Sequence, residues 1–444
     1  MTKPLASLLV SALALSACAV PVEYKRPDLP GTPGWPGAEA SRHAGQDWWR
    51  AFGDPGIDAL VQTALAANSD ILTASLRAQR AMIQAGEARA ALWPQLSGSV
   101  GANRSGGTES YSTSLGASYE LDLRGRLLAQ NNRAALEARA SIADLETARV
   151  TVTANAIEAW WRLADANARI AEAETNLATL RETAALVDRQ VSSGAASDLE
   201  RAQMDQSLAE ARAQIPDLIQ ARDVLRNSLV QILAGREFSE PTALRVRAAL
   251  SIPAGLPADL LSNRPDLRAA ELRLRASLRD VDAARAALYP QITLTGSLGT
   301  SSTDLGRILR DPASTLGVGV TLPFLNPGAG RRALLVSQLQ YEEAVVAFRQ
   351  SLLAAFGDTD LALKSRERIA ERQGQLARAL AAAREAERLT GLRYGAGAIP
   401  LRDLLQAQER RRAAQSALNT ADLDRRLADL QLLRSLGASP EVSG

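Results

Sequence analysis

The chain has 444 residues, enough for two or three ordinary domains, and its 46% hydrophobic and 23% charged residues are normal for a folded protein. Its 51 basic and 49 acidic residues leave a formal net charge of +2, so no nucleic-acid partner is expected. One cysteine excludes an internal disulfide and a cysteine-rich metal site. The one histidine, His43, lies in a proline-rich arm, and no Ser-His-Asp set, zinc spacing or phosphate loop is found. We therefore do not expect an enzyme.

Residues 1–17 have the pattern of a secretory signal peptide. Lys3 precedes the apolar run Pro4–Leu15, which is too short to cross a bilayer. The run ends in Leu15-Ser-Ala-Cys18, which resembles the lipobox of bacterial lipoproteins. That resemblance implies cleavage before Cys18 and acylation of its sulfur. Ala19, in place of aspartate, favours the outer membrane by the same resemblance.

A buried core cysteine that happens to follow a signal peptide is the alternative interpretation of Cys18. No apolar stretch of 18 residues follows the signal, so no transmembrane helix is expected. Transmembrane β-strands are not excluded, because alternating strands do not stand out in hydropathy.

The mature chain carries an internal duplication. Ala88-Arg-Ala-Ala-Leu-Trp-Pro-Gln95 returns as Ala284-Arg-Ala-Ala-Leu-Tyr-Pro-Gln291. The repeat length of about 200 residues is far above the roughly 50 of a solenoid unit, which indicates a duplicated half-molecule. The expected order is an arm (18–53), a first repeat (54–236) with a β-hairpin (95–124), a linker (237–263), a second repeat (264–436) with a β-hairpin (291–325), and a tail (437–444).

The first helix is expected from Asp54-Pro55, a capping residue followed by a proline in the first turn, through to Leu92. Apolar residues then occupy every second position, from Leu115 to Leu123 in one repeat and from Leu316 to Phe324 in the other. Period two predicts strands. Their partners are 95–102 and 291–300, joined by polar loops at 103–110 and 301–313. A small soluble hairpin covered by a helix would show the same alternation.

Very long helices follow each hairpin. There is neither Gly nor Pro from Arg126 to Ser193, and apolar residues recur there with heptad spacing. One helix of that length would measure roughly 100 Å. A second long helix is expected over 331–390, and returning helices over 197–233 and 401–436, with a kink at Pro216. The helices are expected to pair as antiparallel coiled coils.

The chain resembles the outer membrane factor (TolC-like) family, and within it the lipoprotein branch that serves resistance–nodulation–division (RND) efflux pumps. The motifs that carry the resemblance spread from residue 49 to about 430: Trp49-Arg-Ala-Phe52, Asn68-Ser-Asp-Ile71, the two repeated segments, Tyr119-Glu-Leu-Asp-Leu123, Asn263-Arg-Pro-Asp-Leu267, Leu322-Pro-Phe324, and Arg393-Tyr394 with Gly397.

This resemblance implies a mainly α-helical fold with a membrane β-barrel. Three chains would each contribute two β-hairpins to one twelve-stranded outer-membrane barrel, and the coiled-coil helices would form a hollow cylinder in the periplasm. The implied partners are two further copies of the chain, a periplasmic adaptor, an inner-membrane RND-type transporter and outer-membrane lipid. No cofactor and no metal are implied.

Strand alternation assigns two faces on this interpretation. Lipid-facing residues are expected to be Tyr119, Leu121, Leu123, Val318, Val320 and Leu322. Lumen-facing residues are expected to be Ser118, Glu120 and Asp122. Trp93 and Tyr289 stand where helix gives way to strand, a suitable depth for an aromatic girdle.

The resemblance also implies a narrow periplasmic aperture, with a tyrosine and two aspartates near the tip of the second coiled coil. Tyr394 matches the tyrosine and Asp403 the first aspartate, whereas the second falls on Gln406. Glu409, one turn further on, is the alternative second acid. Arg402, Asp403 and Gln406 of three chains are expected to form the closed aperture.

The function implied is a passive exit duct for drugs or other small toxic molecules. A protein-secretion duct is a related alternative, which the lipobox and the Trp49 motif disfavour. A structural coiled-coil lipoprotein without a pore is the alternative from another class, but it has no use for two alternating hairpins. Neither the substrate nor the adaptor can be named from the chain, because specificity in such systems lies largely in the pump.

Overall fold

A computed structural model describes residues 23–27, 47–242 and 264–437. Cys18, most of the proline-rich arm and most of the predicted linker lie outside these residues. The chain forms two compact units, the first made of Met1–Gly31, Ala74–Leu145 and Asp266–Leu353, the second of Thr32–Thr73, Glu146–Pro265 and Ala354–Gly444. The long helices contribute residues to both units.

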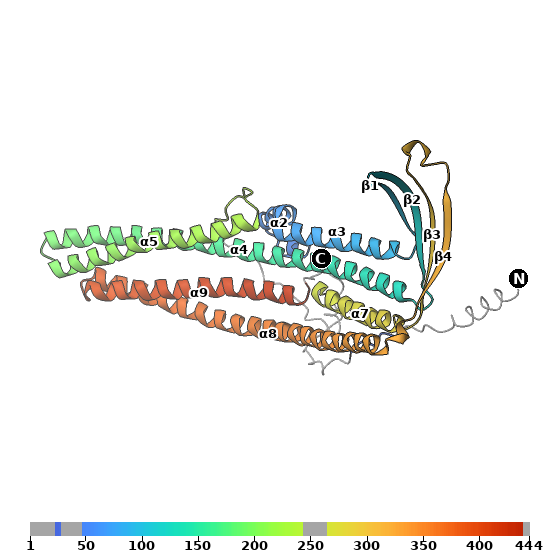
Figure 1. The fold of residues 1–444 in the computed structure, drawn as a ribbon. Coiled ribbons are helices and arrows are strands. Elements are labelled where there is room, and N and C mark those ends of the chain that lie inside the picture. The colour runs from blue at the N-terminus through green and yellow to red at the C-terminus, as the bar shows by residue number, and fades with distance from the viewer. Residues whose placement is uncertain (1–22, 28–46, 243–263, 438–444) are drawn as a thin grey trace. The chain divides into compact units, whose positions relative to one another are not determined.

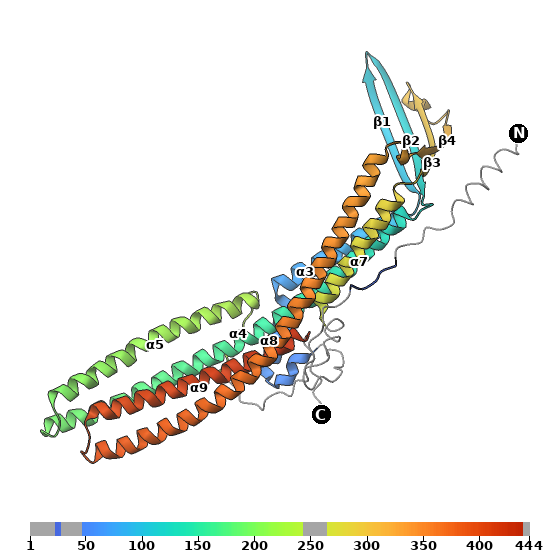
Figure 2. The same ribbon diagram turned by 90° about the horizontal axis from the view of Figure 1, so that it is seen from below.

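The first unit contains a four-stranded antiparallel sheet in the order β1-β2-β3-β4 (Figure 1), seen from below in Figure 2. Strands β1 (Gln95–Ser105) and β2 (Thr108–Leu121) form one hairpin, and β3 (Gln291–Ser302) and β4 (Ala313–Thr321) form the other. The two hairpins join through β2 and β3, where Leu115 lies opposite Leu298. Sequence reasoning predicted the hairpins, and the structure shows in addition that they share one sheet.

The loop predicted at 103–110 is wrong, because most of it is strand. Asn103 pairs with Ser110 and Arg104 with Glu109, which leaves a two-residue turn at Gly106-Gly107. Both glycines have positive φ angles, 59° and 88°, as tight hairpin turns require. The residues at this end of the sheet are polar on both faces. They therefore lack the apolar–polar alternation from which strands were predicted, and the segment was predicted to be a loop. The other connection, between Ser302 and Ala313, contains only the short 3-10 helix η2 (Leu305–Arg307).

Helical segments also belong to the first unit. They are α7 (Pro265–Ala286), the end of α3 (Ser69–Ala90), the start of α4 (Arg126–Ser192) and the start of α8 (Pro327–Gly395), which follows the 3-10 helix η3 (Pro323–Leu325). Buried alanines at Ala140, Ala143 and Ala269 let α4 and α7 approach closely. Arg273 of α7 pairs with Asp144 and, at 3.3 Å, with Glu137 of α4. These contacts fasten one face of α7 to α4.

The second unit contains the two helical hairpins α4/α5 and α8/α9 (Figure 1), with α5 at Asp198–Ile232 and α9 at Leu401–Ser435. Each hairpin turns at a glycine with positive φ, Gly194 at 77° and Gly397 at 71°. Helix α5 starts with a reciprocal capping box between Ser197 and Glu200 and continues through Pro216. The bounds of these long helices agree with the sequence predictions to within a few residues.

The single helix predicted from 55 to 92 is in fact two, α2 (Pro55–Ala67) and α3, separated at Asn68. The Asn68 side-chain oxygen accepts hydrogen bonds from the Asp70 and Ile71 amides at 2.9 and 3.3 Å. Its amide group donates to the Ile232 carbonyl at 2.9 Å, at the end of α5. Asn68 therefore starts α3 and holds it to α5, which explains the break.

An aromatic cluster forms part of the second unit's core. Trp48 and Trp49, buried in the 3-10 helix η1 (Trp48–Phe52), lie edge to face with ring centroids 6.3 Å apart. Phe52 stacks edge to face on Trp161 of α4 at 4.9 Å. The Trp49 motif of the sequence thus packs the chain's N-terminal part against the long helix.

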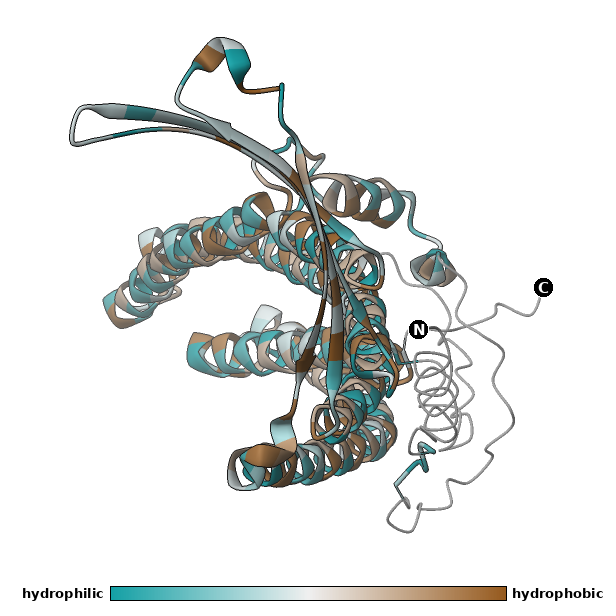
Figure 3. Cartoon of the chain, turned by 45° about the vertical axis from the view of Figure 1, so that its right-hand side comes forward, coloured by the Kyte–Doolittle hydropathy of each residue, from teal (hydrophilic) through white to brown (hydrophobic). Residues whose placement is uncertain are grey.

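No helix in the part of the chain that the structure describes is both long and apolar enough to cross a membrane. Figure 3 shows hydrophobic and hydrophilic residues interspersed along these helices.

Candidate functional site

The sheet of the first unit has one apolar face. Since side chains alternate along a strand, the register places on this face Leu96, Val100, Leu115, Ala117, Tyr119, Leu121, Ile292, Leu294, Leu298, Leu316, Val318 and Val320. Several are fully open in one chain, with Leu316 95% and Val100 85% exposed. An apolar face this large and uncovered is typical of a surface that another molecule or a lipid phase covers.

The opposite face carries small and polar residues. Ser118 lies between Gln95 and Thr295, and Glu120 lies opposite Thr293. Glycines add to it: a Cβ on Gly317 would come 2.8 Å from the Thr295 hydroxyl. A sheet with one apolar and one polar, small-residue face suits a boundary between lipid and water.

Of the residues predicted for the two faces, Tyr119, Leu121, Val318 and Val320 share the apolar face, and Ser118 and Glu120 share the polar one. The remaining three, Asp122, Leu123 and Leu322, lie just past the ends of β2 and β4. The predicted strands were thus too long at this end, because the alternation continues beyond the last strand hydrogen bonds.

The base of β2 is tied to the start of α4 by two carboxylates. Arg126 donates to both carboxylate oxygens of Glu120, at 3.1 and 2.6 Å. The Leu128 amide donates to Asp122 Oδ2 at 2.8 Å. The first turn of α4 holds no acidic residue of its own, so Asp122 supplies the negative charge that the helix N-terminus favours. Sequence reasoning missed both contacts.

Asp122→Ala is expected to loosen the first turn of α4. Loss of one charged cap costs about 1 kcal/mol, which corresponds to roughly fivefold faster local opening. Hydrogen–deuterium exchange of the Leu128 amide in the detergent-purified protein measures it. Asp122→Asn keeps a hydrogen-bond acceptor, so its exchange rate is expected to lie between those of the wild type and the alanine variant. Unchanged exchange in the alanine variant would contradict a capping role.

The tip of the helical hairpins has a small buried core. Tyr394, at the end of α8, packs with Met204, Leu208, Leu401 and Leu404, contributed by α5 and α9. Its hydroxyl donates to Gln190 Oε1 of α4 at 3.0 Å. Burial, followed by the negative charge of Glu200, raises the pKa of the Tyr394 phenol, which stays a neutral donor at physiological pH.

A row of polar contacts continues from the tip along α4. Arg412 donates to Asn176 at 2.6 Å, Asn419 to Glu172 at 3.2 Å, and Arg169 to Thr420 at 3.0 Å. Burial and neighbouring Arg411 lower the pKa of Arg412. Together with Tyr394–Gln190, these contacts form what we call the hairpin seam, which joins α4 to the α8/α9 hairpin.

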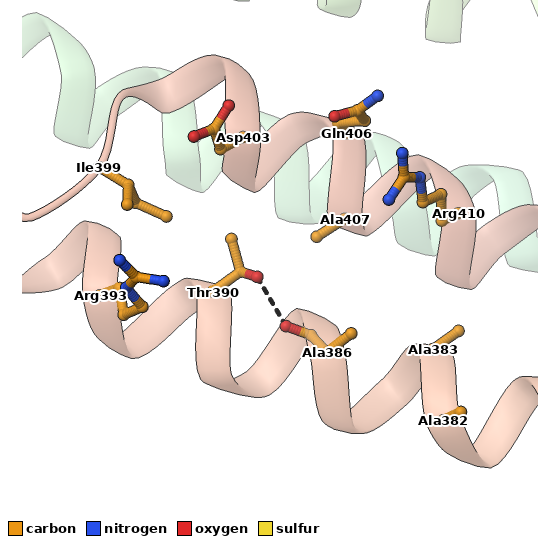
Figure 4. A pocket seen from close by; sticks show the side chains of 10 residues that line it. All are labelled: Ala382, Ala383, Ala386, Thr390, Arg393, Ile399, Asp403, Gln406, Ala407 and Arg410. Carbon is orange, nitrogen blue, oxygen red and sulfur yellow. Dashed lines mark hydrogen bonds between the residues drawn. The ribbon is translucent and has the colours of Figure 1, made fainter.

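A groove of about 460 Å³ lies between α8 and α9 near the tip. Figure 4 shows its lining: Ala382, Ala383, Ala386, Thr390 and Arg393 from α8, and Asp403, Gln406, Ala407 and Arg410 from α9, with Ile399 from the turn. The α9 residues recur at three- and four-residue spacing, so they lie along one helix face. Asp403 is the only acidic residue of this lining, beside two arginines.

The five residues predicted for the aperture lie in three different places. Asp403 and Gln406 line the groove together. Arg402 and Glu409 are exposed outside it, with Arg402 Nε 3.6 Å from Asp403 Oδ1. Tyr394 is buried in the tip core. Sequence reasoning did not place Arg410 with Asp403, although their separation of seven residues, two helical turns, is a signal for it.

The comparisons with known proteins cover nearly the whole chain. The family model described as outer membrane efflux protein matches residues 60–235 and 256–438. The pyoverdine export outer membrane protein OpmQ of Pseudomonas aeruginosa is 31% identical, over 97% of this chain and 96% of that protein. The crystal structure of a Pseudomonas aeruginosa membrane protein has a TM-score of 0.87 at 28% identity, covering 95% of this chain and 98% of that one. The open state of the Neisseria gonorrhoeae outer membrane channel MtrE has a TM-score of 0.82 at 28% identity, covering 96% and 100%.

These matches confirm the fold predicted from the sequence, including its duplicated arrangement of hairpins and long helices. They also favour efflux over the structural lipoprotein and the protein-secretion duct, and the family is one of efflux proteins rather than enzymes. The two-faced sheet and the paired helical hairpins therefore belong to a channel subunit, and the chain is a member of the outer membrane efflux protein family.

Proposed function

We propose that three copies of the chain form the outer-membrane exit duct of a tripartite efflux pump. The observation that carries this proposal is the sheet with an apolar face and a polar face. In one chain β1 and β4 are its edge strands. Unpaired strand edges are not tolerated in lipid, so β4 of one copy would pair with β1 of the next until three copies close a barrel. The polar face then lines the lumen.

The duct is passive in this proposal and conducts drugs or other small toxic molecules. A periplasmic adaptor and an RND-type transporter of the inner membrane deliver them, and the transporter supplies the energy. Acylation of Cys18 anchors the mature chain in the outer membrane, since several acyl chains on one cysteine hold firmly. Trp93 and Tyr289 are exposed aromatic side chains just before the first residues of β1 and β3. Such side chains favour the membrane–water interface, so they support insertion of the sheet with this end at the interface.

The closed aperture lies at the tips of the helical hairpins. We assign Asp403 and Gln406 to it, because both line the groove on one face of α9. Arg410 lies on the same face of α9, Arg393 lines the groove from α8, and Arg402 lies next to Asp403. An aperture of this composition carries more positive than negative charge per chain, so it differs from a cation-selecting double ring of aspartates.

Conductance of the purified protein in a planar lipid bilayer tests both duct and aperture. Wild type is expected to show small, discrete openings, and Asp403→Ala several-fold larger closed-state conductance because the constriction loses a side chain. Glu409→Ala, outside the groove, is the matched control and is expected to behave as wild type. Openings unaffected by Asp403→Ala would move the aperture elsewhere, and no openings from demonstrated trimers would contradict the duct itself.

A further inference from the structure

A short piece of the N-terminal arm is fastened to α7 by a buried carboxylate. Glu271 of α7 is only 7% exposed, although it is charged. Arg26 donates to both carboxylate oxygens of Glu271, from Nη2 at 2.9 and 2.8 Å and from Nε at 3.1 Å, and the Tyr24 hydroxyl adds a fourth hydrogen bond at 3.3 Å. These partners are about 245 positions apart in the chain, so the contact is a tertiary one.

Arg275 completes the site from the next turn of α7. Its guanidinium donates to Glu271 Oε1 at 2.8 Å and lies over the Tyr24 ring, 4.7 Å from the centroid. Buried carboxylates are costly unless they are paired and hydrogen-bonded. Without the arm, Glu271 would keep only Arg275 among these partners. Glu271 therefore has the chemistry expected of a docking site for the arm. We call the four residues that form this site, Tyr24, Arg26, Glu271 and Arg275, the arm clamp.

The arm clamp lies on a different side of α7 from the contacts with α4. Arg273, two residues after Glu271, points to the opposite side of the helix and pairs with α4. Ala269 faces α4 as well. α4 thus contacts one side of α7, and the arm docks on another side.

The distance from the arm clamp to the strands matches the length of chain before it. Glu271 lies fifteen positions before Ala286, the last residue of α7, which is about 22 Å along the helix. Cys18 lies eight positions before Arg26, and that stretch spans at most about 29 Å when extended. An arm held at Glu271 therefore has enough chain, and only a few ångströms to spare, to bring residue 18 past the end of α7 toward β3, which begins at Gln291.

We propose that the arm clamp is the docking site of the mature N-terminus and that it sets the depth at which the lipid anchor enters the membrane. The acylated residue 18 and the end of the sheet nearest the helices would then lie at the same membrane surface. The chain between residue 18 and Arg26 has little spare length, so neither could move far from that surface alone. This inference rests on the proposed acylation of Cys18, whereas the docking of residues 23–27 on α7 does not.

A lysine-specific protease tests the docking. After signal cleavage the chain has two lysines, Lys25 in the docked segment and Lys364 in α8, so two cuts are possible. Glu271→Gln is expected to speed the cut after Lys25 about tenfold while the cut after Lys364 keeps its rate. Asp280→Asn, which removes the α7 partner of Arg133, is the matched control and is expected to leave both rates unchanged. Arg26→Ala, at a half-exposed side chain, should reproduce the effect if Glu271→Gln does not fold.

Equal rates after Lys25 in wild type and both clamp variants would overturn the docking site. The mass of the released peptide gives a separate answer on the lipid. Acyl chains on residue 18 of this peptide would support the anchor. A peptide without acyl chains would overturn both the proposed acylation and the depth-setting role. The docking of the arm would still be decided by the cleavage rates after Lys25.

A shortened arm tests the depth-setting role. Deleting Val20-Pro-Val22 removes about 10 Å of reach. Folded trimer in the outer membrane is expected to fall several-fold, and Glu271→Gln in the same chain is expected to restore it because release of the arm returns the missing length. A deletion without effect, or one that Glu271→Gln does not relieve, would overturn the proposal.

Discussion

Replacing Leu115 by arginine is expected to abolish assembly of the channel in the outer membrane. Leu115 lies near the middle of β2 on the apolar face, opposite Leu298 of β3. An arginine facing lipid near the bilayer midplane costs about 2–4 kcal/mol, and three copies carry the cost in one trimer. The measurement is the amount of heat-modifiable trimer in isolated outer membranes, compared on unheated and heated gels.

Ser114→Arg is the matched control, since Ser114 is the preceding residue and faces the polar side. It loses the 2.8 Å contact with the Ser99 hydroxyl, worth about 1 kcal/mol, but its charge enters water. We expect trimer levels near those of wild type. Glu120→Arg is a poorer control, because it would set two arginines against each other at the base of β2. Equal loss in the Leu115 and Ser114 variants would contradict the assignment of the two faces.

Tyr394→Phe is expected to shift the duct strongly toward its open state. The change removes one hydrogen bond to Gln190 while leaving the packing of the tip core in place. One such bond contributes about 1 kcal/mol, so three chains lose about 3 kcal/mol, roughly a hundredfold in the closed-to-open equilibrium. Single-channel recording in planar bilayers measures the open probability directly.

Tyr341→Phe removes a hydroxyl from the same helix away from the tip and is expected to behave as wild type. Gln190→Ala should also open the duct, and the double variant should add little to either single one, because both break the same contact. Additive effects, or a Tyr394 variant indistinguishable from the Tyr341 control, would show that this hydrogen bond does not hold the closed state.

Much of the fold could be predicted because its signals are local. The heptad run without Gly or Pro predicted the full length of α4, since helix periodicity and helix breakers act over a few residues. Period two placed Tyr119 and Glu120 on opposite faces for the same reason. Local signals failed where a polar segment forms strand, as at Asn103, and where one side chain starts a new helix, as at Asn68.

The candidate site was predicted less completely, because its residues meet through tertiary packing. Tyr394 was identified by the family resemblance, which does not give its partner Gln190, on another helix 204 positions away. Asp403 was expected with Arg402 and Gln406. The groove confirms Gln406 on the same face of α9, adds Arg410 to that face, and sets Arg393 of α8 across from it. Helix phase separates Arg402 and Glu409 from that face.

The duplicated order of hairpins and long helices follows from the amino-acid sequence alone, because periodicity, capping residues and glycine turns are properties of neighbouring residues. Which distant side chains meet depends instead on tertiary packing. The pairing of Glu271 with Arg26, and the hairpin seam between α4 and the α8/α9 hairpin, depend on how helices lie side by side. A one-residue change in that register turns a helix face by about 100°, so no local pattern can specify it.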